Sequence, residues 1–314
     1  MKNRKLTVTI GIPAHNEESN IKNMIESVLR QKGESFVLEK ILVVLDGCTD
    51  NTLGIVGSMA KRDRRIKIMH DGKRTGKATR LNQIVTENGS DFVFLIDADM
   101  VLARPIEIER MVLEFVGSKK VNVVAGYQIP TETDSFIGKI NNAAFKLWYG
   151  TTTSIKDGNH IYNLHGSISG LRNSFAKSFT FPNTITCDQG YLYMKAVLSD
   201  REGFKLAKNT KFIFRTVSTI KDSRLQGTRS IFKDKEQMRK YFGKETMAKE
   251  YAIPVKYKII SLIKFLMKDP VYTSLAICLG IFIRIFSLKD DLNKIGVWET
   301  VKSSKKRIRI DQNL

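Results

Sequence analysis

Two aspartates of this chain, Asp97 and Asp99, follow directly on an apolar run at residues 92–96. Carboxylates separated by one residue at the end of a strand can together hold a hard divalent cation, and such a cation can bridge the oxygens of a diphosphate. A D-x-D triplet on its own is equally consistent with two solvated loop acids. The interpretation therefore depends on what the neighbouring segments offer.

Other polar residues also stand at the ends of apolar runs. Asp46 ends a second such run, and in the segment that follows it either Thr49 or Asp50 suits the N-cap of a helix. Residues 73–77 (KRTGK) form a basic, glycine-containing turn in front of a helix, which is suited to approaching a phosphate. Asp188 precedes another helical pattern, so it is either an N-cap or a general base for a bound substrate.

Alternating strands and helices are expected to position these residues. The spacing of apolar residues predicts strands at residues 6–14, 40–46, 66–70 and 91–96. It predicts helices at residues 19–30, 51–62 and 77–85. Such alternation indicates a parallel sheet with right-handed crossovers, whose ligands bind at the carboxyl ends of the strands. Because the candidate residues fall at those ends, we expect them to share one cleft.

The second half of the chain has a mixed pattern. It predicts strands at residues 121–129, 163–171 and 211–216. It predicts helices at residues 136–149 and 189–197. Residues 221–250 are dense in charge, and the chain turns apolar from residue 255.

The composition is that of a globular protein and narrows the class of partner. Of the 314 residues, 42% are hydrophobic and 27% charged, which excludes wholesale disorder. A total of 52 Lys and Arg against 32 Asp and Glu gives a net charge of +20, which indicates nucleic acid, a phosphorylated substrate or an anionic membrane as partner. Nucleic acid is not expected, because no motif for it is present and aromatic residues are not interleaved with the basic clusters. Three widely spaced cysteines favour a reducing compartment.

Taken in order, four segments resemble the nucleotide-binding half of the family 2 inverting glycosyltransferases, which have the GT-A fold. They are residues 12–18 (IPAHNEE), 46–52 (DGCTDNT), 76–82 (GKATRLN) and 97–99 (DAD). These segments are similar to the family's first nucleotide-binding segment, its base-recognising turn, its Gly-Lys…Leu-Asn element and its metal-binding triplet. The resemblance implies an α/β fold with a Rossmann-like, mostly parallel central sheet flanked by helices.

The acceptor half carries the resemblance more loosely. Residues 166–172 (GSISGLR) are similar to the small-residue strand that lines the sugar and acceptor site of the family. Residues 186–189 (TCDQ) stand where the family has a triplet that ends in the catalytic base. Cys187 replaces the customary Glu of that triplet, so only Asp188 carries over.

A third similarity lies near residue 230. Gln226 and Arg229 resemble the Gln-x-x-Arg-Trp motif of processive members, but Ser230 replaces the Trp, which argues against processive synthesis. The likeness spans about residues 6–232, with a generic similarity around Trp298.

The resemblance also implies a role for each candidate. It identifies a glycosyltransferase that uses a nucleotide sugar, with a UDP-sugar expected, and Mn²⁺ or Mg²⁺ as cofactor. Asp97 and Asp99 are the implied metal ligands and Asp188 the implied base, and a single base gives in-line displacement with inversion. The residues expected to contact the nucleotide are Pro13, Ala14, Asn16, Glu17, Asp46, Lys77, Asp97, Gln226 and Arg229.

The C-terminal part of the chain has the composition of a membrane-associated hairpin. Residues 255–267 place apolar side chains on one helical face and lysines on another, a pattern typical of interfacial helices. Asp269 and Pro270 interrupt it, and the apolar run at 271–288 gives about 27 Å of helix against a hydrocarbon core of about 30 Å. Basic residues on both sides of this run favour a monotopic hairpin on the cytoplasmic face of the membrane. A single crossing and a hairpin packed on the catalytic domain are the alternatives.

The expected organisation is a GT-A catalytic domain at residues 1–225, followed by interface helices at 226–254, the hairpin at 255–288 and a basic cytoplasmic tail at 289–314. Residue 100 divides the catalytic domain into a nucleotide-binding half and an acceptor half. We expect a saccharide or lipid-linked acceptor beside an anionic membrane surface. Two other interpretations stay open: a non-catalytic module that binds polyanions or membranes, and a nucleotidyltransferase, which also uses paired acids and a basic glycine turn.

Overall fold

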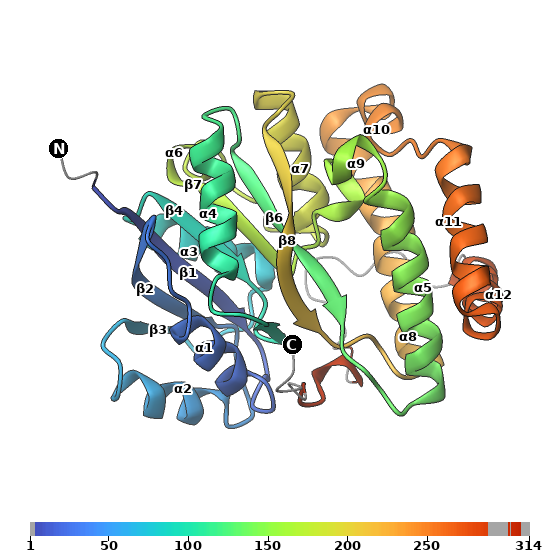
Figure 1. Cartoon of the computed structure of the whole chain (residues 1–314). Coiled ribbons are helices and arrows are strands. Elements are labelled where there is room, and N and C mark those ends of the chain that lie inside the picture. Colours follow the sequence, from blue (N-terminus) through green and yellow to red (C-terminus); the bar gives the residue numbers. More distant parts are fainter. Residues whose placement is uncertain (1–3, 288–300, 302, 309–314) are drawn as a thin grey trace.

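An eight-stranded sheet runs through the computed structural model, which describes residues 4–287, 301 and 303–308 (Figure 1). The strand order is β3-β2-β1-β4-β7-β6-β8-β5. The strands, in chain order from β1 to β8, are Leu6–Ala14, Phe36–Leu45, Ile66–His70, Phe92–Ile96, Met100–Leu102, Val123–Pro130, Ile168–Arg172 and Phe204–Phe214.

The first half of the sheet is parallel, as the alternation predicts. Strand β1 pairs in parallel with β2 and β4, and β2 pairs in parallel with β3. Further along, β7 is antiparallel to both β4 and β6, β6 is parallel to β8, and β5 is antiparallel to β8. The turn that holds Asp97 and Asp99 connects β4, which pairs with β1 and β7, to β5, which pairs with β8, so both of its ends are fixed in the sheet.

Helices cover both faces of the sheet. Helices α1, α2 and α4 pack on one face and α3, α6 and α7 on the other (Figure 1). Their bounds, in chain order, are Ile21–Leu29, Thr52–Ala60, Lys77–Glu87, Glu107–Gly117, Asn173–Ala176 and Asp188–Ser199. Helix α1 buries Ile21, Met24, Ile25 and Val28, the face that its spacing predicts.

The structure extends the prediction in three places. Strands β2 and β8 begin at Phe36 and Phe204, well before the predicted residues 40 and 211, because charged residues interrupt the apolar pattern of each. The sequence predicts no element at residues 100–117, where the structure has β5 and α4. Strand β5 has three residues, too few to show the alternation of a strand. The apolar spacing of α4, in contrast, is present in the sequence and could have been used to predict that helix.

The chain becomes helical after β8. Helix α8 (Ile220–Gly227) runs through the π-helical η3 (Thr228–Lys233) into α9 (Asp234–Phe242) and α10 (Lys244–Glu250). The segment where a hairpin was expected forms α11 (Val255–Lys268) and α12 (Pro270–Ser287), separated by Asp269.

Both hairpin helices pack on α5 (Phe136–Thr152) at one end of the molecule (Figure 1). Gly150 of α5 leaves space for the ring of Phe265, since a Cβ there would lie 2.7 Å from the ring. Short 3-10 turns, η1 (Lys156–Gly158) and η2 (Ile161–Asn163), connect α5 to β7.

Within the described residues, no helix is both long enough and apolar enough to cross a bilayer. Most of the expected basic tail, Trp298 included, lies outside the described residues. The described tail residues 303–308 contain the 3-10 turn η4 (Ser303–Lys305).

Candidate active site

A cleft of about 260 Å³ opens where the carboxyl ends of β1, β2 and β4 meet. Its walls come from the loops after these strands, the start of α3, the π-helical η3 and the tail residues Val301, Ser304 and Lys305. The expected site residues that line it are Pro13, Ala14, Glu17, Asp46, Lys77, Asp97, Asp99 and Arg229. The parallel crossovers thus gather most of the candidates in one place.

The ammonium of Lys77 links the two groups of acids that the sequence singled out. Lys77 is the first residue of α3, and its Nζ lies 2.8 Å from Asp97 Oδ1 and 3.5 Å from Asp188 Oδ2. The same Nζ donates a hydrogen bond of 2.8 Å to the carbonyl oxygen of Gly166. Burial alone lowers the pKa of an ammonium, but the carboxylates of Asp188 and Asp97 outweigh it and raise the pKa of Lys77 above its usual range.

Asp188 faces this ammonium from the start of α7. Cys187 occupies the N-cap position of α7, so the interpretation of Asp188 as the N-cap is wrong. The side chain of Asp188 is 15% exposed, and a Cβ on the adjacent Gly166 would lie 3.1 Å from its Oδ2. Burial raises the pKa of Asp188, while the neighbouring Lys77 acts in the opposite direction.

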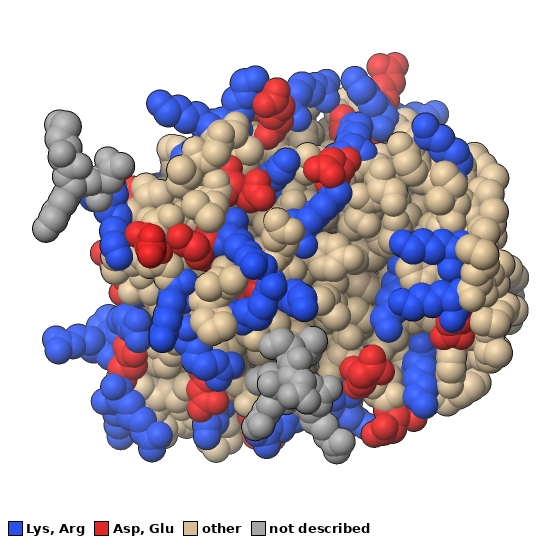
Figure 2. Space-filling model, viewed as in Figure 1, with Lys and Arg blue, Asp and Glu red and all other residues tan. Residues whose placement is uncertain are grey.

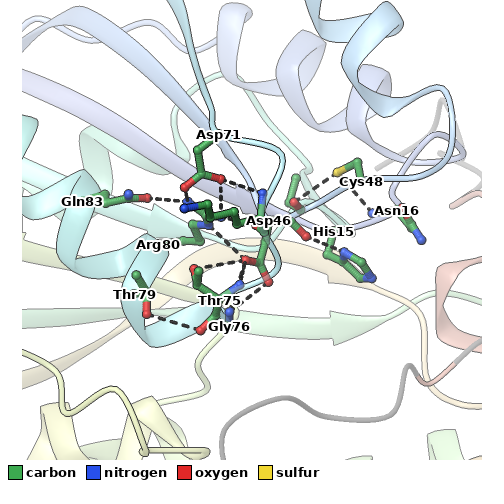
Figure 3. A network of polar contacts seen from close by, with 12 residues as sticks. His15, Asn16, Asp46, Cys48, Asp71, Thr75, Gly76, Thr79, Arg80 and Gln83 are labelled. Carbon is green, nitrogen blue, oxygen red and sulfur yellow. Dashed lines mark hydrogen bonds and ion pairs between the residues drawn. The ribbon is translucent and has the colours of Figure 1, made fainter.

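Asp46 holds the basic turn in place (Figure 3). Its Oδ1 accepts hydrogen bonds from the backbone N–H of Thr75 at 2.7 Å and from Nε of Arg80 at 3.0 Å. Gly76 has a φ of 93°, which favours glycine, and its N–H also points to this carboxylate, at 3.2 Å from either oxygen. Arg80 continues to Asp71 at 2.8 Å, so a buried guanidinium connects α3 to two loops.

Two expected nucleotide contacts are not among the residues that line the cleft. Asn16 joins the loops after β1 and β2: its Oδ1 accepts from the N–H of Thr49 at 2.7 Å, and its Nδ2 donates to Thr49 Oγ1 at 3.0 Å. Gln226 is exposed on α8, one turn before Arg229, which does line the cleft. The structure therefore separates Gln226 from the group with which the sequence placed it.

Glu17 and Asp99 form a second group of carboxyl oxygens at the cleft. Burial and the nearby Asp99 raise the pKa of Glu17 to about 8, and burial and Asp97 raise the pKa of Asp99. Glu17 Oε2 is buried and has no hydrogen-bond partner among the described residues. Such a concentration of carboxylate oxygens favours a bound cation.

The oxygens of Asp97 and Asp99 fit the expected cofactor, because Mg²⁺ and Mn²⁺ prefer hard oxygen ligands. In the described part of the chain, no group of three or more His, Cys, Asp or Glu side chains gathers to enclose a metal. Proteins commonly bind Mg²⁺ through one or two carboxylates, with substrate phosphates as further ligands. The pair fits a metal that is shared with a bound diphosphate.

Arg80 and Lys305 are charged residues of the cleft that were not among the sequence candidates. Arg80 stands inside the quoted segment 76–82, where a lone arginine in an otherwise apolar helical face was the available signal. Lys305 comes from the tail, and its Nζ lies 2.6 Å from Glu17 Oε1. Nothing local in the sequence around Lys305 indicates a contact with a residue nearly 290 positions away.

Comparison with known families identifies residues 9–179 as a match to the family model described as "Glycosyl transferase family 2". Among curated proteins, the chain is similar to the poly-beta-1,6-N-acetyl-D-glucosamine synthases of Staphylococcus aureus (strain COL) and Staphylococcus epidermidis, at 26% and 25% identity over 171 residues. The matched region is 54% of this chain and 40% of each synthase, so it spans less than half the length of these relatives.

Solved structures resemble the whole architecture at low identity. The mannosyltransferase PcManGT from Pyrobaculum calidifontis, in complex with GDP-Man and Mn²⁺, has a TM-score of 0.56 at 15% identity and covers 92% of this chain and 77% of its own. TarS of S. aureus has a TM-score of 0.50 at 15% identity and covers 90% of this chain and 54% of its own. Glucosyl-3-phosphoglycerate synthase from Mycobacterium tuberculosis, with Mn²⁺, UDP and phosphoglyceric acid, has a TM-score of 0.51 at 14% identity and covers 74% and 78%.

These likenesses confirm the expected α/β GT-A fold. The matched region contains β1, β2, β4 and α3, the elements whose ends form most of the cleft. Since the family model covers more than half of the 314 residues, this protein belongs to glycosyl transferase family 2.

Proposed function

We propose that this protein is a metal-dependent, inverting glycosyltransferase that moves a sugar from a nucleotide sugar to an acceptor at an anionic membrane surface. One observation carries the catalytic part of the proposal. Lys77 Nζ lies within 2.8 Å of Asp97 and 3.5 Å of Asp188, so an expected metal ligand and the expected base face one another across one ammonium.

Each group has a distinct chemical task in this scheme. A divalent cation on Asp97 and Asp99 supplies neutralisation of the leaving diphosphate when it is bound. Lys77 and Arg229 line the same cleft and add positive charge there. Asp188 accepts the proton of the acceptor hydroxyl, and burial, which raises its pKa, makes the carboxylate a stronger base. One base without a covalent nucleophile gives inversion.

The donor class is supported by the proteins that this chain resembles. PcManGT was solved with GDP-Man and the M. tuberculosis synthase with UDP, while the curated relatives are named for N-acetyl-D-glucosamine. We expect a UDP-sugar, carrying a hexose or an N-acetylhexosamine, as the donor.

A donor panel tests the proposal. Purified protein is incubated with UDP-glucose, UDP-GlcNAc and GDP-mannose, with Mn²⁺, Mg²⁺ or EDTA, and the released nucleotide is identified. We expect a nucleoside diphosphate from one donor only when a divalent metal is present. Release that is equal in EDTA would contradict metal dependence. Pyrophosphate in place of a nucleoside diphosphate would identify a nucleotidyltransferase, and no release with any donor would favour the non-catalytic module.

The membrane part of the proposal is supported by the surface of the hairpin. Helix α11 exposes apolar side chains, with Ile260 62% and Met267 77% exposed. Its lysines at positions 256, 258, 264 and 268 are exposed as well. Figure 2 shows basic side chains among uncharged ones at this end of the molecule. An apolar face beside lysines suits an anionic lipid surface, where each nearby lysine contributes about 1 kcal/mol.

A further inference from the structure

Residues 303–308, which we name the C-terminal strap, dock on the catalytic domain at two points (red in Figure 1). At one end, the N–H of Ser303 donates to Asp222 Oδ2 at 2.9 Å, and its Oγ accepts from the N–H of Ser218 at 3.0 Å. At the other end, Ile308 is 1% exposed and packs in a cluster with Val101 and Ile213. The strap is therefore a packed part of the structure.

The side chain of Asn20 ties the middle of the strap to the nucleotide-binding half. Its Nδ2 donates to the carbonyl oxygen of Lys305 at 2.8 Å, and its Oδ1 accepts from the N–H of Ile308 at 3.0 Å. Asn20 is the N-cap residue of α1 and is 1% exposed. Both bonds of this buried amide go to the strap backbone, which fixes the position of Lys305.

The side chain of Lys305 extends from the strap into the wall of the cleft. Its Nζ forms an ion pair of 2.6 Å with Glu17 Oε1 and donates to the carbonyl oxygens of Asn16, at 3.1 Å, and His15. The side chain is 23% exposed, and Lys305 lines the cleft together with Asp99. An ammonium of the tail thus lies on the loop that follows β1.

Two other cations of the cleft, Lys77 and Arg80, each form ion pairs with two acids. Lys77 pairs with Asp97 and Asp188, and Arg80 pairs with Asp46 and Asp71. Within the described residues, Lys305 forms one ion pair, with Glu17, and its flexible four-carbon stem lets the ammonium turn toward a new anion. A diphosphate brought in with a divalent metal places negative charge at this side of the cleft.

We propose that Lys305 is a donor-binding residue, which contacts the diphosphate of the nucleotide sugar, and that the strap is a wall of the donor site. This inference rests on the proposed function. Charge-assisted hydrogen bonds to phosphate oxygens are roughly twice as strong as neutral ones, so the loss of this ammonium weakens diphosphate binding. Through Lys305, the C-terminal part of the chain contributes to the affinity for the donor.

Calorimetric titration with UDP or GDP in the presence of Mn²⁺ tests the inference. Lys305→Ala is expected to weaken binding of the preferred nucleoside diphosphate by about tenfold, and binding of the corresponding nucleoside by less than about twofold. Lys305→Arg keeps the charge and should retain most of the affinity. Lys306→Ala is the matched control, because Lys306 is the exposed neighbour and carries the same charge. Melting temperatures verify that each variant is folded.

Three results would overturn the inference. Unchanged diphosphate affinity in Lys305→Ala would show that the ammonium makes no contact, and tighter binding would show that the strap obstructs the site. An equal loss for nucleoside and diphosphate would indicate a structural role only. If the wild-type protein binds no nucleoside diphosphate with any divalent metal, the proposed function is wrong, and this inference is wrong with it. If the wild-type protein binds and Lys305→Ala binds equally well, only the role of Lys305 is wrong.

Discussion

At the scale of single residues, the pair of Lys77 and Asp188 is the most informative contact. The two side chains come from helices on the same face of the sheet, and 3.5 Å separates their charged atoms. An ion pair of this kind holds the carboxylate in place while leaving 15% of its side chain exposed. The carboxylate of Asp188 is therefore partly open to solvent, although Asp188 is not among the residues that line the cleft.

Asp188→Asn should lower turnover by about 10²–10⁴-fold, the usual contribution of a general base. Binding of a nucleoside diphosphate with Mn²⁺ should be retained, because Asp97, Asp99 and Lys77 are unchanged. Initial rates and calorimetry measure the two effects separately. Asp134→Asn, at an exposed aspartate outside the cleft, is the control and should behave as the wild type. Near-normal turnover in Asp188→Asn would remove the assignment of the base.

Arg80 offers a second prediction. Its side chain is 2% exposed and its Nε pairs with Asp46 at 3.0 Å, so Arg80→Leu leaves a carboxylate that is only 10% exposed without this cation. Removing one partner of a buried pair typically costs about 3–5 kcal/mol of unfolding free energy. Adding Asp46→Asn should recover part of that loss, and urea denaturation of the single and double variants measures it. If the two losses are simply additive, the ion pair is not what stabilises the turn.

The sequence predicted which residues meet at the cleft better where they follow a strand than where they come from a distant part of the chain. Asp97 and Lys77 could be placed because parallel strands bring their carboxyl ends to one edge. Gln226 was assigned by motif alone, and the turn of η3 that brings Arg229 to the cleft leaves Gln226 exposed. Lys305 could not be found, since apolar periodicity reports only on neighbours along the chain.

At the scale of elements, the hairpin of α11 and α12 has one packed surface and one exposed surface. One surface is fixed to α5, where Ser261 Oγ donates to the carbonyl oxygen of Leu147 at 3.1 Å. The other surface exposes apolar residues and lysines. The attachment to α5 would hold the catalytic cleft at a set distance from whatever the exposed surface binds.

Reversing the charge of Lys256, Lys258 and Lys264 on α11 should weaken binding to anionic vesicles by at least about tenfold, given about 1 kcal/mol for each lysine. Cosedimentation with phosphatidylglycerol and phosphatidylcholine vesicles measures the change. The control reverses three exposed lysines distant from the hairpin, Lys32, Lys67 and Lys119. An equal loss in both sets would show that total charge, and not the hairpin, determines binding.

A contact between the start of α9 and the end of α10 gives a pH-dependent prediction. Asp234 Oδ2 accepts from the hydroxyl of Tyr251 at 2.6 Å, while its Oδ1 is buried without a partner among the described residues. Burial raises the pKa of Asp234 to about 6. Because this exceeds the unfolded value of about 3.9, the folded state binds the proton more tightly, and this group makes the protein less stable as pH rises from about 4 to about 6.

Asp234→Asn should therefore raise the unfolding free energy at pH 7.5 by about 1–3 kcal/mol and give little gain at pH 4.5. Urea denaturation at the two pH values provides the measurement. Asp134→Asn again serves as the control and should show no difference between them. A gain that is the same at both pH values would assign the effect to packing and not to ionisation.

The elements themselves were predicted in proportion to the regularity of their patterns. Strand β1 was predicted at its observed bounds, because apolar and small residues fill it from Leu6 to Ala14. Strand β8 was predicted only at its end, since Lys208 and Asn209 interrupt its centre and are exposed there. The antiparallel insertion of β7 depends on long-range pairing and has no local signature.

At the scale of the whole molecule, metal and nucleotide should stabilise the fold together. A ligand that binds only the folded state at 100 times its dissociation constant adds about 2.7 kcal/mol, which corresponds to a rise of roughly 5 °C in melting temperature. We expect this rise with UDP or GDP plus Mn²⁺, and its loss on addition of EDTA. The variant with both Asp97→Asn and Asp99→Asn should show no effect of Mn²⁺ on nucleotide binding. A full response in that variant would place the metal elsewhere.

The two hydrogen bonds that Asn20 makes to the strap join residues that are synthesised far apart in time. Asn20 leaves the ribosome early, whereas Ile308, whose N–H it accepts, is 288 residues later in the sequence. During synthesis, the amide of Asn20, the carboxylate of Asp222 and the apolar cluster around Val101 stay uncovered until residues 303–308 emerge. The hairpin helices emerge before them. If Lys305 binds the donor as proposed, the donor site stays incomplete until residues 303–308 have been synthesised and have docked on the catalytic domain.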